Sequence, residues 1–261
     1  YSAESTNDIF QNVDFGPERQ LSLDFIAHGL TRKLVLNQRQ DMMSKNFTIF
    51  LQENGTVKTK KLKHHEISSC SYVGKIGKQQ NSLVGLSIYN GITGIINDGE
   101  TLYNSIHSGC KHFLDIRKTS TDNRFLYLRS RWNSVKYPKK FIELFVVTAK
   151  DLSDILKTTD YAISYTRSIL NILNLMYESL NIKIVLTGIM TLNKENLFEI
   201  DSNNMTKTLQ HFIQFRHKFL LPAKPHDLAI LFTADSSNGD ERGKATVGTM
   251  CKESGGAVVS L

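Results

Sequence analysis

The chain has 261 residues, of which 40% are hydrophobic and 22% charged, and it carries a net charge of +7. This composition is ordinary for a soluble globular protein, and the length fits one large domain or two of medium size. The longest apolar runs, such as residues 141–149, are far too short to span a bilayer, so no membrane segment is expected.

The positive charge is unevenly distributed. Residues 1–140 contain 20 Lys and Arg against 12 Asp and Glu, whereas residues 141–261 contain 12 against 13. The densest basic stretch, residues 58–63, is compatible with weak polyanion binding or with a strand edge protected by lysine. The second interpretation is favoured because no aromatic side chains interleave with the lysines, and nucleic acid is not an expected partner. The charge split therefore indicates two unlike halves.

In the first half, short segments of alternating apolar and polar residues predict β-strands. Glu53, Asn54 and Gly55 predict a hairpin turn between two alternating segments. The predicted strands cover residues 21–26, 32–36, 47–51, 57–62, 82–89, 91–96 and 101–106. Short strands at this spacing predict a β-rich antiparallel sandwich or barrel.

A polar, basic segment at residues 115–138 separates the halves and is typical of a protease-accessible linker. The predicted organisation is therefore a first domain over residues 1–114, a linker over 115–138 and a second domain over 139–261.

The second half alternates strand and helix signals. Strands are predicted at residues 141–149, 182–190, 227–233 and 257–261, and helices at 161–180 and 205–220. This order is the signature of an α/β domain with a largely parallel sheet.

Two acids stand out in these strands, because Glu143 lies in an otherwise apolar run and Asp227 opens another. A carboxylate in a buried strand is costly unless it is paired or binds a cation. Two acids at strand ends suit a hard cation such as Ca²⁺, but a salt bridge or an exposed edge explains them equally well. No G-x-S-x-G, P-loop or G-x-G-x-x-G motif occurs.

The three cysteines, Cys70, Cys110 and Cys251, fit no metal-ligand spacing, and their odd number leaves one unpaired within the chain. Asn46, Asn54 and Asn204 begin N-glycosylation sequons. About three sequons are expected by chance at this composition, so they permit secretion without indicating it.

Four segments of the second half, in order, resemble reprolysin-type zinc metalloproteases, the class of ADAMs, ADAMTS proteins and snake-venom metalloproteases. They are Lys-Phe-Ile-Glu-Leu-Phe-Val-Val at 140–147, Tyr-Glu-Ser-Leu-Asn-Ile-Lys-Ile-Val-Leu-Thr-Gly at 177–188, His-Asp-Leu-Ala-Ile-Leu-Phe-Thr at 226–233 and Val-Gly-Thr-Met-Cys at 247–251. The first half is more loosely similar to the family's prodomain, at residues 69–76 and 82–94. The resemblance implies an incomplete α/β metzincin-type catalytic domain behind a prodomain.

The resemblance also implies roles for individual residues. Glu143 and Asp227 match positions of a structural calcium site, and Cys251 matches a cysteine whose disulfide partner comes later in the catalytic domain. The strand containing Gly256, Ala257, Val258 and Val259 is similar to the family's edge strand, which pairs with an extended peptide substrate.

The chain departs from the family at the catalytic metal. The zinc signature H-E-x-x-H-x-x-G-x-x-H does not occur in the sequence, and the resemblance places it beyond Leu261. As given, the chain is therefore expected to be inactive.

The role of Cys110 and the site of activation cleavage stay open as well. Cys70 pairs with Cys110, or Cys110 acts as a cysteine switch on the zinc. The basic candidates for activation cleavage are Arg129 to Arg131 and Lys139 with Lys140.

The expected function is a secreted, extracellular zymogen of a zinc metalloendopeptidase that hydrolyses protein substrates, with zinc and calcium as cofactors of the complete protein. The alternative is a catalytically inactive relative, of a venom or other extracellular effector kind, that binds a partner. A polyanion-binding module is a third interpretation, tested by heparin retention that depends on residues 58–63.

Overall fold

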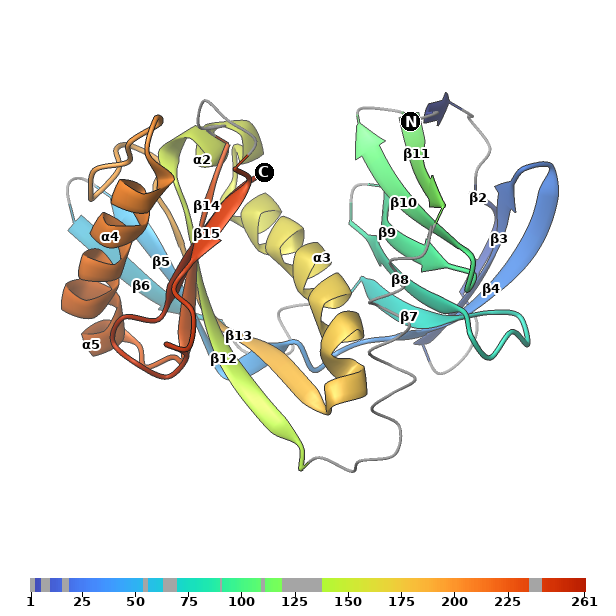
Figure 1. Cartoon of the computed structure of the whole chain (residues 1–261), viewed down its shortest axis with the longest axis horizontal. Helices are drawn as coiled ribbons and strands as arrows, with labels where there is room; N and C mark the ends of the chain where they lie inside the picture. Colours follow the sequence, from blue (N-terminus) through green and yellow to red (C-terminus); the bar gives the residue numbers. More distant parts are fainter. Residues whose placement is uncertain are drawn as a thin grey trace. The chain divides into compact units, whose positions relative to one another are not determined.

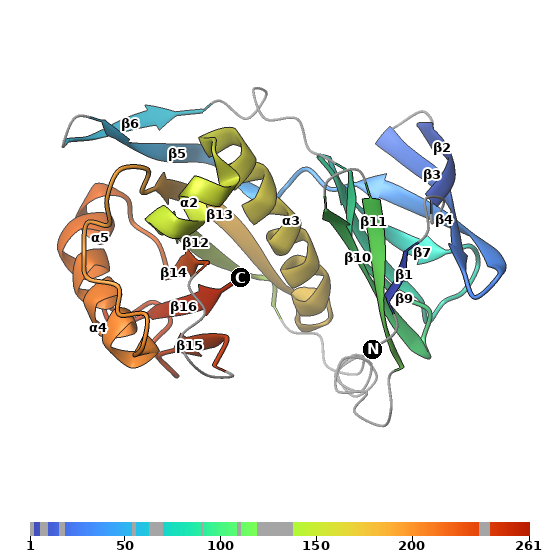
Figure 2. The ribbon, with the colours of Figure 1, turned by 90° about the horizontal axis from the view of Figure 1, so that it is seen from above.

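A computed structural model describes most of the chain, namely residues 3–5, 10–15, 19–53, 56–62, 70–89, 91–108, 111–118, 138–234 and 241–261. The residues group into two compact units (Figures 1 and 2). Unit 1 comprises Tyr1–Met42, Ser68–Lys140 and Arg167–Lys183, and unit 2 comprises Met43–Ile67, Phe141–Thr166 and Ile184–Leu261.

The strands described in unit 1 form one antiparallel sheet of nine, in the order β1-β11-β10-β9-β8-β7-β4-β3-β2. They are β1 (Ala3–Ser5), β2 (Phe10–Phe15), β3 (Gln20–Ala27), β4 (Leu30–Gln38), β7 (Ser71–Ile76), β8 (Leu83–Ile88), β9 (Ile92–Asn97), β10 (Thr101–Ser108) and β11 (Lys111–Lys118). In β3, alternate residues are buried, as the apolar–polar alternation predicted. Leu21, Leu23 and Phe25 thus face the core of the unit.

The predicted antiparallel, β-rich character of the first half is confirmed. The described strands do not form the predicted sandwich or closed barrel. The described strands form a single sheet, and β1 and β2 at its two ends do not pair with each other. The predicted linker also begins too early, because β11 extends through residues 115–118 by pairing with β10. The remainder, residues 119–137, lies outside the described part, as do the cleavage candidates Arg129 and Arg131.

The second part of helix α3 (Thr159–Tyr177) belongs to unit 1 and packs on this sheet. The Asn171 amide donates to the backbone carbonyls of Tyr72 and Leu86, at 3.2 and 3.0 Å. A Cβ on Gly85 would lie only 2.9 Å from a Leu175 methyl group. A glycine in β8 thus allows the helix to approach the sheet closely.

Unit 2 is built on a mixed sheet of seven described strands, in the order β15-β16-β14-β12-β13-β5-β6. They are β5 (Met43–Glu53), β6 (Thr56–Lys61), β12 (Lys140–Thr148), β13 (Ile182–Thr191), β14 (Leu228–Thr233), β15 (Gly243–Ala245) and β16 (Gly256–Ser260). β12, β14 and β16 run parallel, as the α/β pattern of the second half predicted.

The β5–β6 hairpin lies where the sequence predicted it, but in the other sheet. β5 pairs in parallel with β13, so the hairpin extends the sheet of unit 2. Residues 47–50 of β5 are all buried, and the ring of Phe50 meets that of Phe145 edge-to-face at 5.2 Å. Continuous burial is typical of a strand that is covered on both faces of its sheet. The sequence had predicted that this hairpin would belong to a separate sheet formed by the first half.

Gly188 of β13 allows the pairing of β13 with β5. A Cβ there would lie 2.5 Å from the Phe145 ring and 3.2 Å from the Thr48 carbonyl of β5.

Helix α4 (Met205–Phe215) covers one face of this sheet (Figure 2). Its Met205, Leu209 and Phe212 pack with Phe145 and Leu231 of the strands. A π-helical turn (Arg216–Leu220) and α5 (Leu221–Ala223) continue α4, and α2 (Lys150–Leu156) follows β12. No helix in the described ranges combines the length and apolar character needed to cross a membrane.

Candidate functional site

Among the described strands of unit 2, β15 and β6 are the two outer strands of the sheet, and the short strand β15 hydrogen-bonds to β16 on one side. The strand predicted to be the edge, with Gly256, Ala257, Val258 and Val259, is β16. That prediction is wrong in position, because β16 pairs with β14 on one side and with β15 on the other. The sequence of β15, Gly-Lys-Ala, has no apolar run that would have predicted a strand.

The register of β15 shows which backbone groups face outward. Ser260 donates its N–H to the Arg242 carbonyl, and Thr246 donates its N–H to the Gly256 carbonyl. Hydrogen-bonded pairs alternate along an antiparallel ladder, so Gly243 and Ala245 direct their N–H and C=O groups away from β16. No strand in the described residues pairs with that side. The edge can therefore accept an extended peptide as a further strand.

The two acids singled out by the sequence, Glu143 and Asp227, lie side by side at the start of β12 and β14. Asp227 donates its N–H to the Glu143 carbonyl at 2.9 Å, and its Oδ2 accepts the Glu143 N–H at 2.9 Å. The Glu143 side chain is exposed. The pair supplies carboxylate oxygens of the kind Ca²⁺ binds, but only a fraction of the six to eight ligands it takes.

Cys251 lies beside this pair. Its N–H donates to the Asp227 carbonyl at 3.1 Å, and its Sγ lies 3.4 Å from Asp227 Oδ1. The hydrogen bond to Asp227, together with desolvation and the negative carboxylate, raises the pKa of the Cys251 thiol. The thiol is therefore protonated at neutral pH and not activated as a nucleophile or metal ligand.

Arg216, in the π-helical turn, holds the Cys251 loop against the start of β14. It is 1% exposed, and its guanidinium donates to the carbonyls of Lys252, Glu253, His226 and Asp227 at 2.8 to 3.2 Å. Burial lowers the pKa of Arg216. Four carbonyls around one guanidinium satisfy a charge that would otherwise be costly to bury.

His226 completes this network. Its Nδ1 lies 2.7 Å from the Lys224 carbonyl, which only accepts, so Nδ1 carries the proton and Nε2 accepts from Arg216 Nε at 3.0 Å. Burial lowers the pKa of His226 to about 4, and the Arg216 charge adds to the shift despite the bond to Lys224. The ring is therefore neutral at pH 7.

A binding site for the catalytic zinc was sought among the described residues. No group of three His, Cys, Asp or Glu side chains capable of holding a metal occurs among the described residues. The described residues therefore supply no ligand set for the catalytic ion, and no hydrolytic step is assigned to them.

Comparison with known proteins shows which family the second half of the chain resembles. Residues 140–261 match the model of the Reprolysin (M12B) family zinc metalloprotease. The second half of this chain is of the reprolysin type. The resemblance inferred from the four sequence segments is thus confirmed.

Two curated relatives share the description disintegrin and metalloproteinase domain-containing protein. Disintegrin and metalloproteinase domain-containing protein 9 of Homo sapiens is 28% identical over 269 residues, which cover 90% of this chain and 32% of that protein. Protein 15 of the same series from Rattus norvegicus is 25% identical, over 90% of this chain and 30% of its own length. The chain thus spans about a third of the length of these curated relatives.

Among solved structures, metalloproteinase-II from Bacteroides fragilis aligns over 91% of this chain and 74% of its own, with 8% identity and a TM-score of 0.41. This likeness is too low to support an argument.

The remaining site residues predicted from the sequence are the sequon asparagines and the cysteines. The sequon residues Asn46 and Asn204 are exposed, and Asn54 lies outside the described residues. Cys70 is half-buried with a free thiol, and Cys110 lies outside the described part, so their pairing and the cysteine switch stay predictions. Cys251 is exposed and also free.

The basic stretch 58–63 lies mostly on β6. Lys58, Lys60 and Lys61 are exposed on the outer strand of the described sheet, as the interpretation of a lysine-protected edge requires. Polyanion binding stays a prediction.

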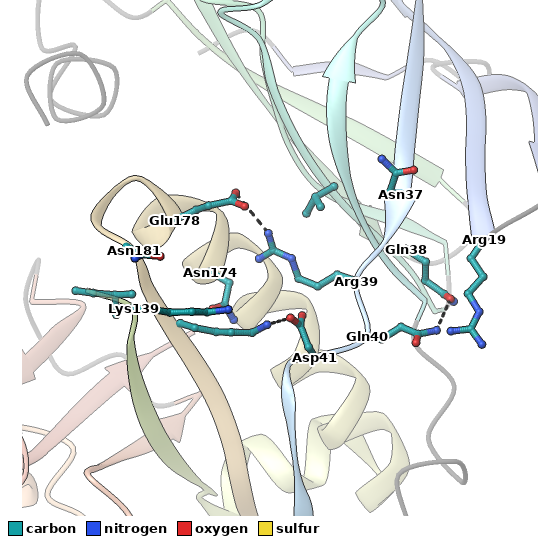
Figure 3. A pocket seen from close by; sticks show the side chains of 13 residues that line it. Arg19, Asn37, Gln38, Arg39, Gln40, Asp41, Lys139, Asn174, Glu178 and Asn181 are labelled. Atoms are coloured by element: carbon teal, nitrogen blue, oxygen red, sulfur yellow. Dashed lines mark hydrogen bonds and ion pairs between the residues drawn. The ribbon is translucent and has the colours of Figure 1, made fainter. Parts of the chain in front are cut away.

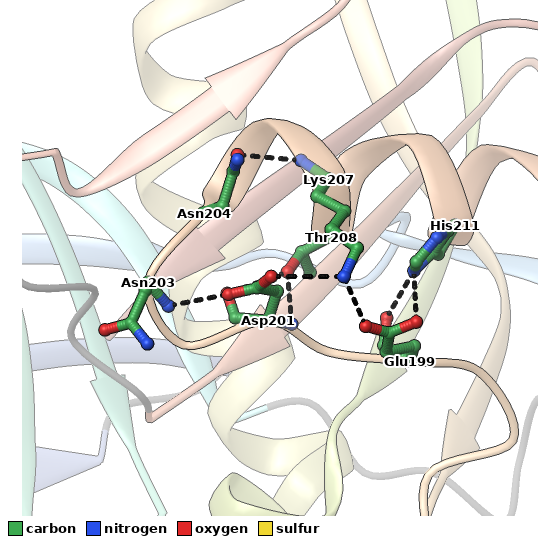
Figure 4. A network of polar contacts seen from close by, with 7 residues as sticks. All are labelled: Glu199, Asp201, Asn203, Asn204, Lys207, Thr208 and His211. Atoms are coloured by element: carbon green, nitrogen blue, oxygen red, sulfur yellow. Dashed lines mark hydrogen bonds and ion pairs between the residues drawn. The ribbon is translucent and has the colours of Figure 1, made fainter.

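Asn204 has a second role, because its Oδ1 caps α4 by accepting the Lys207 N–H at 3.1 Å (Figure 4). Lys207 in turn contacts Glu199 and Asp201, at 2.5 and 3.3 Å, and His211 Nδ1 lies 3.1 Å from the Glu199 carbonyl. The Lys207 ammonium lowers the pKa of Glu199. This cluster fixes the start of α4. An N-glycan would occupy Nδ2 of Asn204 and leave the capping oxygen free.

Sequence reasoning missed Arg216 and His226. Their signal is weak, since a lone Arg in a helix and a His before a strand are usually surface residues. Only the fold shows that they meet.

Proposed function

We propose that this chain is the propeptide and first catalytic segment of a secreted, zymogenic zinc metalloendopeptidase, and that β15 receives the substrate. The observation that carries the proposal is the open edge of β15, on a sheet in which β12, β13, β14, β15 and β16 lie within the residues that match a metalloprotease family. A peptide pairing with Gly243 and Ala245 gains main-chain hydrogen bonds that accept many side chains. Such pairing suits an enzyme that cleaves protein substrates.

Zinc enters this proposal only through the whole protein. When bound, the ion would polarise the scissile carbonyl and activate water. The part that this chain performs is to hold the substrate backbone in an extended form beside β15.

Calcium belongs to the proposal as a structural ion. Glu143 and Asp227 would contribute carboxylate oxygens at the strand ends, on the side where the Cys251 loop is anchored. Further oxygen ligands would have to complete that site.

Replacing Ala245 by proline tests the substrate edge. Proline removes the outward N–H of residue 245 but leaves the β15–β16 hydrogen bonds intact, since those use residues 242, 244 and 246. In the full-length protein, kcat/KM for an internally quenched peptide is expected to fall about tenfold, corresponding to the loss of one main-chain hydrogen bond.

The matched control is Lys244→Ala. The Lys244 side chain forms an exposed ion pair with Glu241, and its backbone pairs with β16. This variant should keep kcat/KM within about twofold, because exposed ion pairs contribute little. Equal activity of Ala245→Pro and the parent protein would show that the peptide does not pair with β15.

A further inference from the structure

Unit 1 contains a cavity of about 590 Å³ that has no counterpart in the proposed peptidase function (Figure 3). All its lining residues belong to unit 1. They come from the end of β4 and the residues after it, from the last turns of α3 with the following 3₁₀ turn (Glu178–Leu180), from the start of β13, and from Arg19, Val73 and Lys139. Segments far apart in the sequence thus converge on one hollow, large enough for a small molecule.

The lining is rich in positive charge. Four cationic residues, Arg19, Arg39, Lys139 and Lys183, face two acids, Asp41 and Glu178. Arg39 lies 3.6 Å from Glu178 (Figure 3). Lys183 contacts Asp41. The cavity therefore carries an excess of two positive charges even when both ion pairs are formed.

The cationic side chains of the cavity are more buried than the acidic ones. The side chains of Arg39 and Lys183 are only 10% and 16% exposed, whereas those of Glu178 and Asp41 are 66% and 65% exposed. Exposed partners contribute at most about 1 kcal/mol each, less than burying a cation costs. The acids can rotate into solvent, but the cations are held inside.

The positive charges of Arg39 and Lys183 also repel each other. Burial lowers the pKa of Lys183, and the neighbouring Arg39 charge lowers it further. Burial likewise lowers the pKa of Arg39, against the effect of Glu178. A third group that is negative and small enough to lie between them would relieve this repulsion.

Amide side chains surround the charged centre. Gln38, Gln40 and Asn174 line the cavity, with Asn37 and Asn181 beside them. Amides both donate and accept, so they suit hydroxyl groups rather than a second charge. We propose that this cavity binds a sulfate or phosphate group carried on a sugar-sized, hydroxyl-bearing molecule, with Arg39 and Lys183 on the anion and the amides on the hydroxyl groups.

Isothermal titration calorimetry on the 261-residue chain tests the proposal with three probes: N-acetylglucosamine 6-sulfate, N-acetylglucosamine 6-phosphate and unmodified N-acetylglucosamine. At least one charged sugar is expected to bind with a Kd below about 1 mM, and the uncharged sugar at least about tenfold more weakly. The ratio of the two charged sugars tells whether the natural group is a sulfate or a phosphate. Absence of heat with both charged sugars would overturn the proposal.

Three variants locate the site. Arg39→Gln and Lys183→Gln should each weaken binding at least about tenfold, because each removes a charge-assisted hydrogen bond. Asp41→Asn should tighten it about threefold, because it removes a competing negative charge. Lys75→Gln, an exposed lysine on β7 outside the cavity, is the control and should leave Kd within about twofold.

The direction of the Asp41 effect is the sharpest discriminator, since a misfolded variant would bind less and not more. Binding that is unchanged in Arg39→Gln, or that is lost equally in Lys75→Gln, would show that the anion binds elsewhere on the basic surface. Circular dichroism on each variant confirms that the comparison is made between folded proteins.

Discussion

Replacing Arg216 by alanine is expected to lower the free energy of unfolding of unit 2 by about 3 to 5 kcal/mol. The change removes a guanidinium that is 1% exposed and takes one donor from each of four carbonyls and from His226 Nε2. The Asp227 and Lys252 carbonyls keep the backbone N–H groups of Cys251 and Gly255 as donors. Each unmet buried group costs about 1 to 3 kcal/mol, and relaxation of the Cys251 loop towards water recovers part of the loss. Urea denaturation followed by circular dichroism measures the effect.

Two companion variants make this result specific. Arg216→Lys keeps the charge but lacks the planar fork, so it should recover less than half of the lost stability. Arg242→Ala removes an exposed arginine next to β15 and should change stability by no more than about 0.5 kcal/mol. If Arg216→Ala were as stable as Arg242→Ala, the guanidinium would not be what anchors the loop.

Acidification from pH 7 to about pH 4 is expected to destabilise unit 2 by about 3 kcal/mol through His226 alone. Its pKa is about 4 in the folded protein and 6.5 in the unfolded chain, a difference of about 2.5 units. Between these values the unfolded chain binds a proton that the folded protein does not, so stability falls as pH falls. The contribution is fully present above about pH 6.5.

His226→Gln tests the assignment, because glutamine does not titrate and still offers an acceptor to Arg216. Free energies of unfolding measured at pH 7, 6, 5 and 4 should fall steeply in the parent protein and by less than about 1 kcal/mol in the variant. Parallel curves for the two proteins would mean that another group carries the pH dependence.

Much of the reprolysin-type half was predictable because its signals are local. Apolar runs gave the positions of β12, β13 and β14, and the helical spacing of residues 161–180 gave α3. Glu143 and Asp227, which the sequence singled out together, also lie side by side, because β12 and β14 are neighbours in a parallel sheet.

The features that the sequence did not predict depend on contacts between residues far apart in the chain. β15 is three residues long and has no strand pattern of its own, so β16 looked like the edge. The β5–β6 hairpin was recognised from its turn, but nothing local shows that β5 pairs with β13, about 140 residues later. The cavity of unit 1 assembles from at least four segments and left no motif at all. Tertiary contacts decide such features, and propensity does not.

The most direct test of the account is to measure zinc content and peptide cleavage together on the full-length product of this gene. A zinc metalloendopeptidase should contain about one zinc per molecule, cleave a protein substrate after the propeptide is released, and lose both properties on treatment with a zinc chelator. A full-length protein that binds no zinc and cleaves nothing, while still binding peptides at β15, would contradict the peptidase function and identify an inactive binding relative.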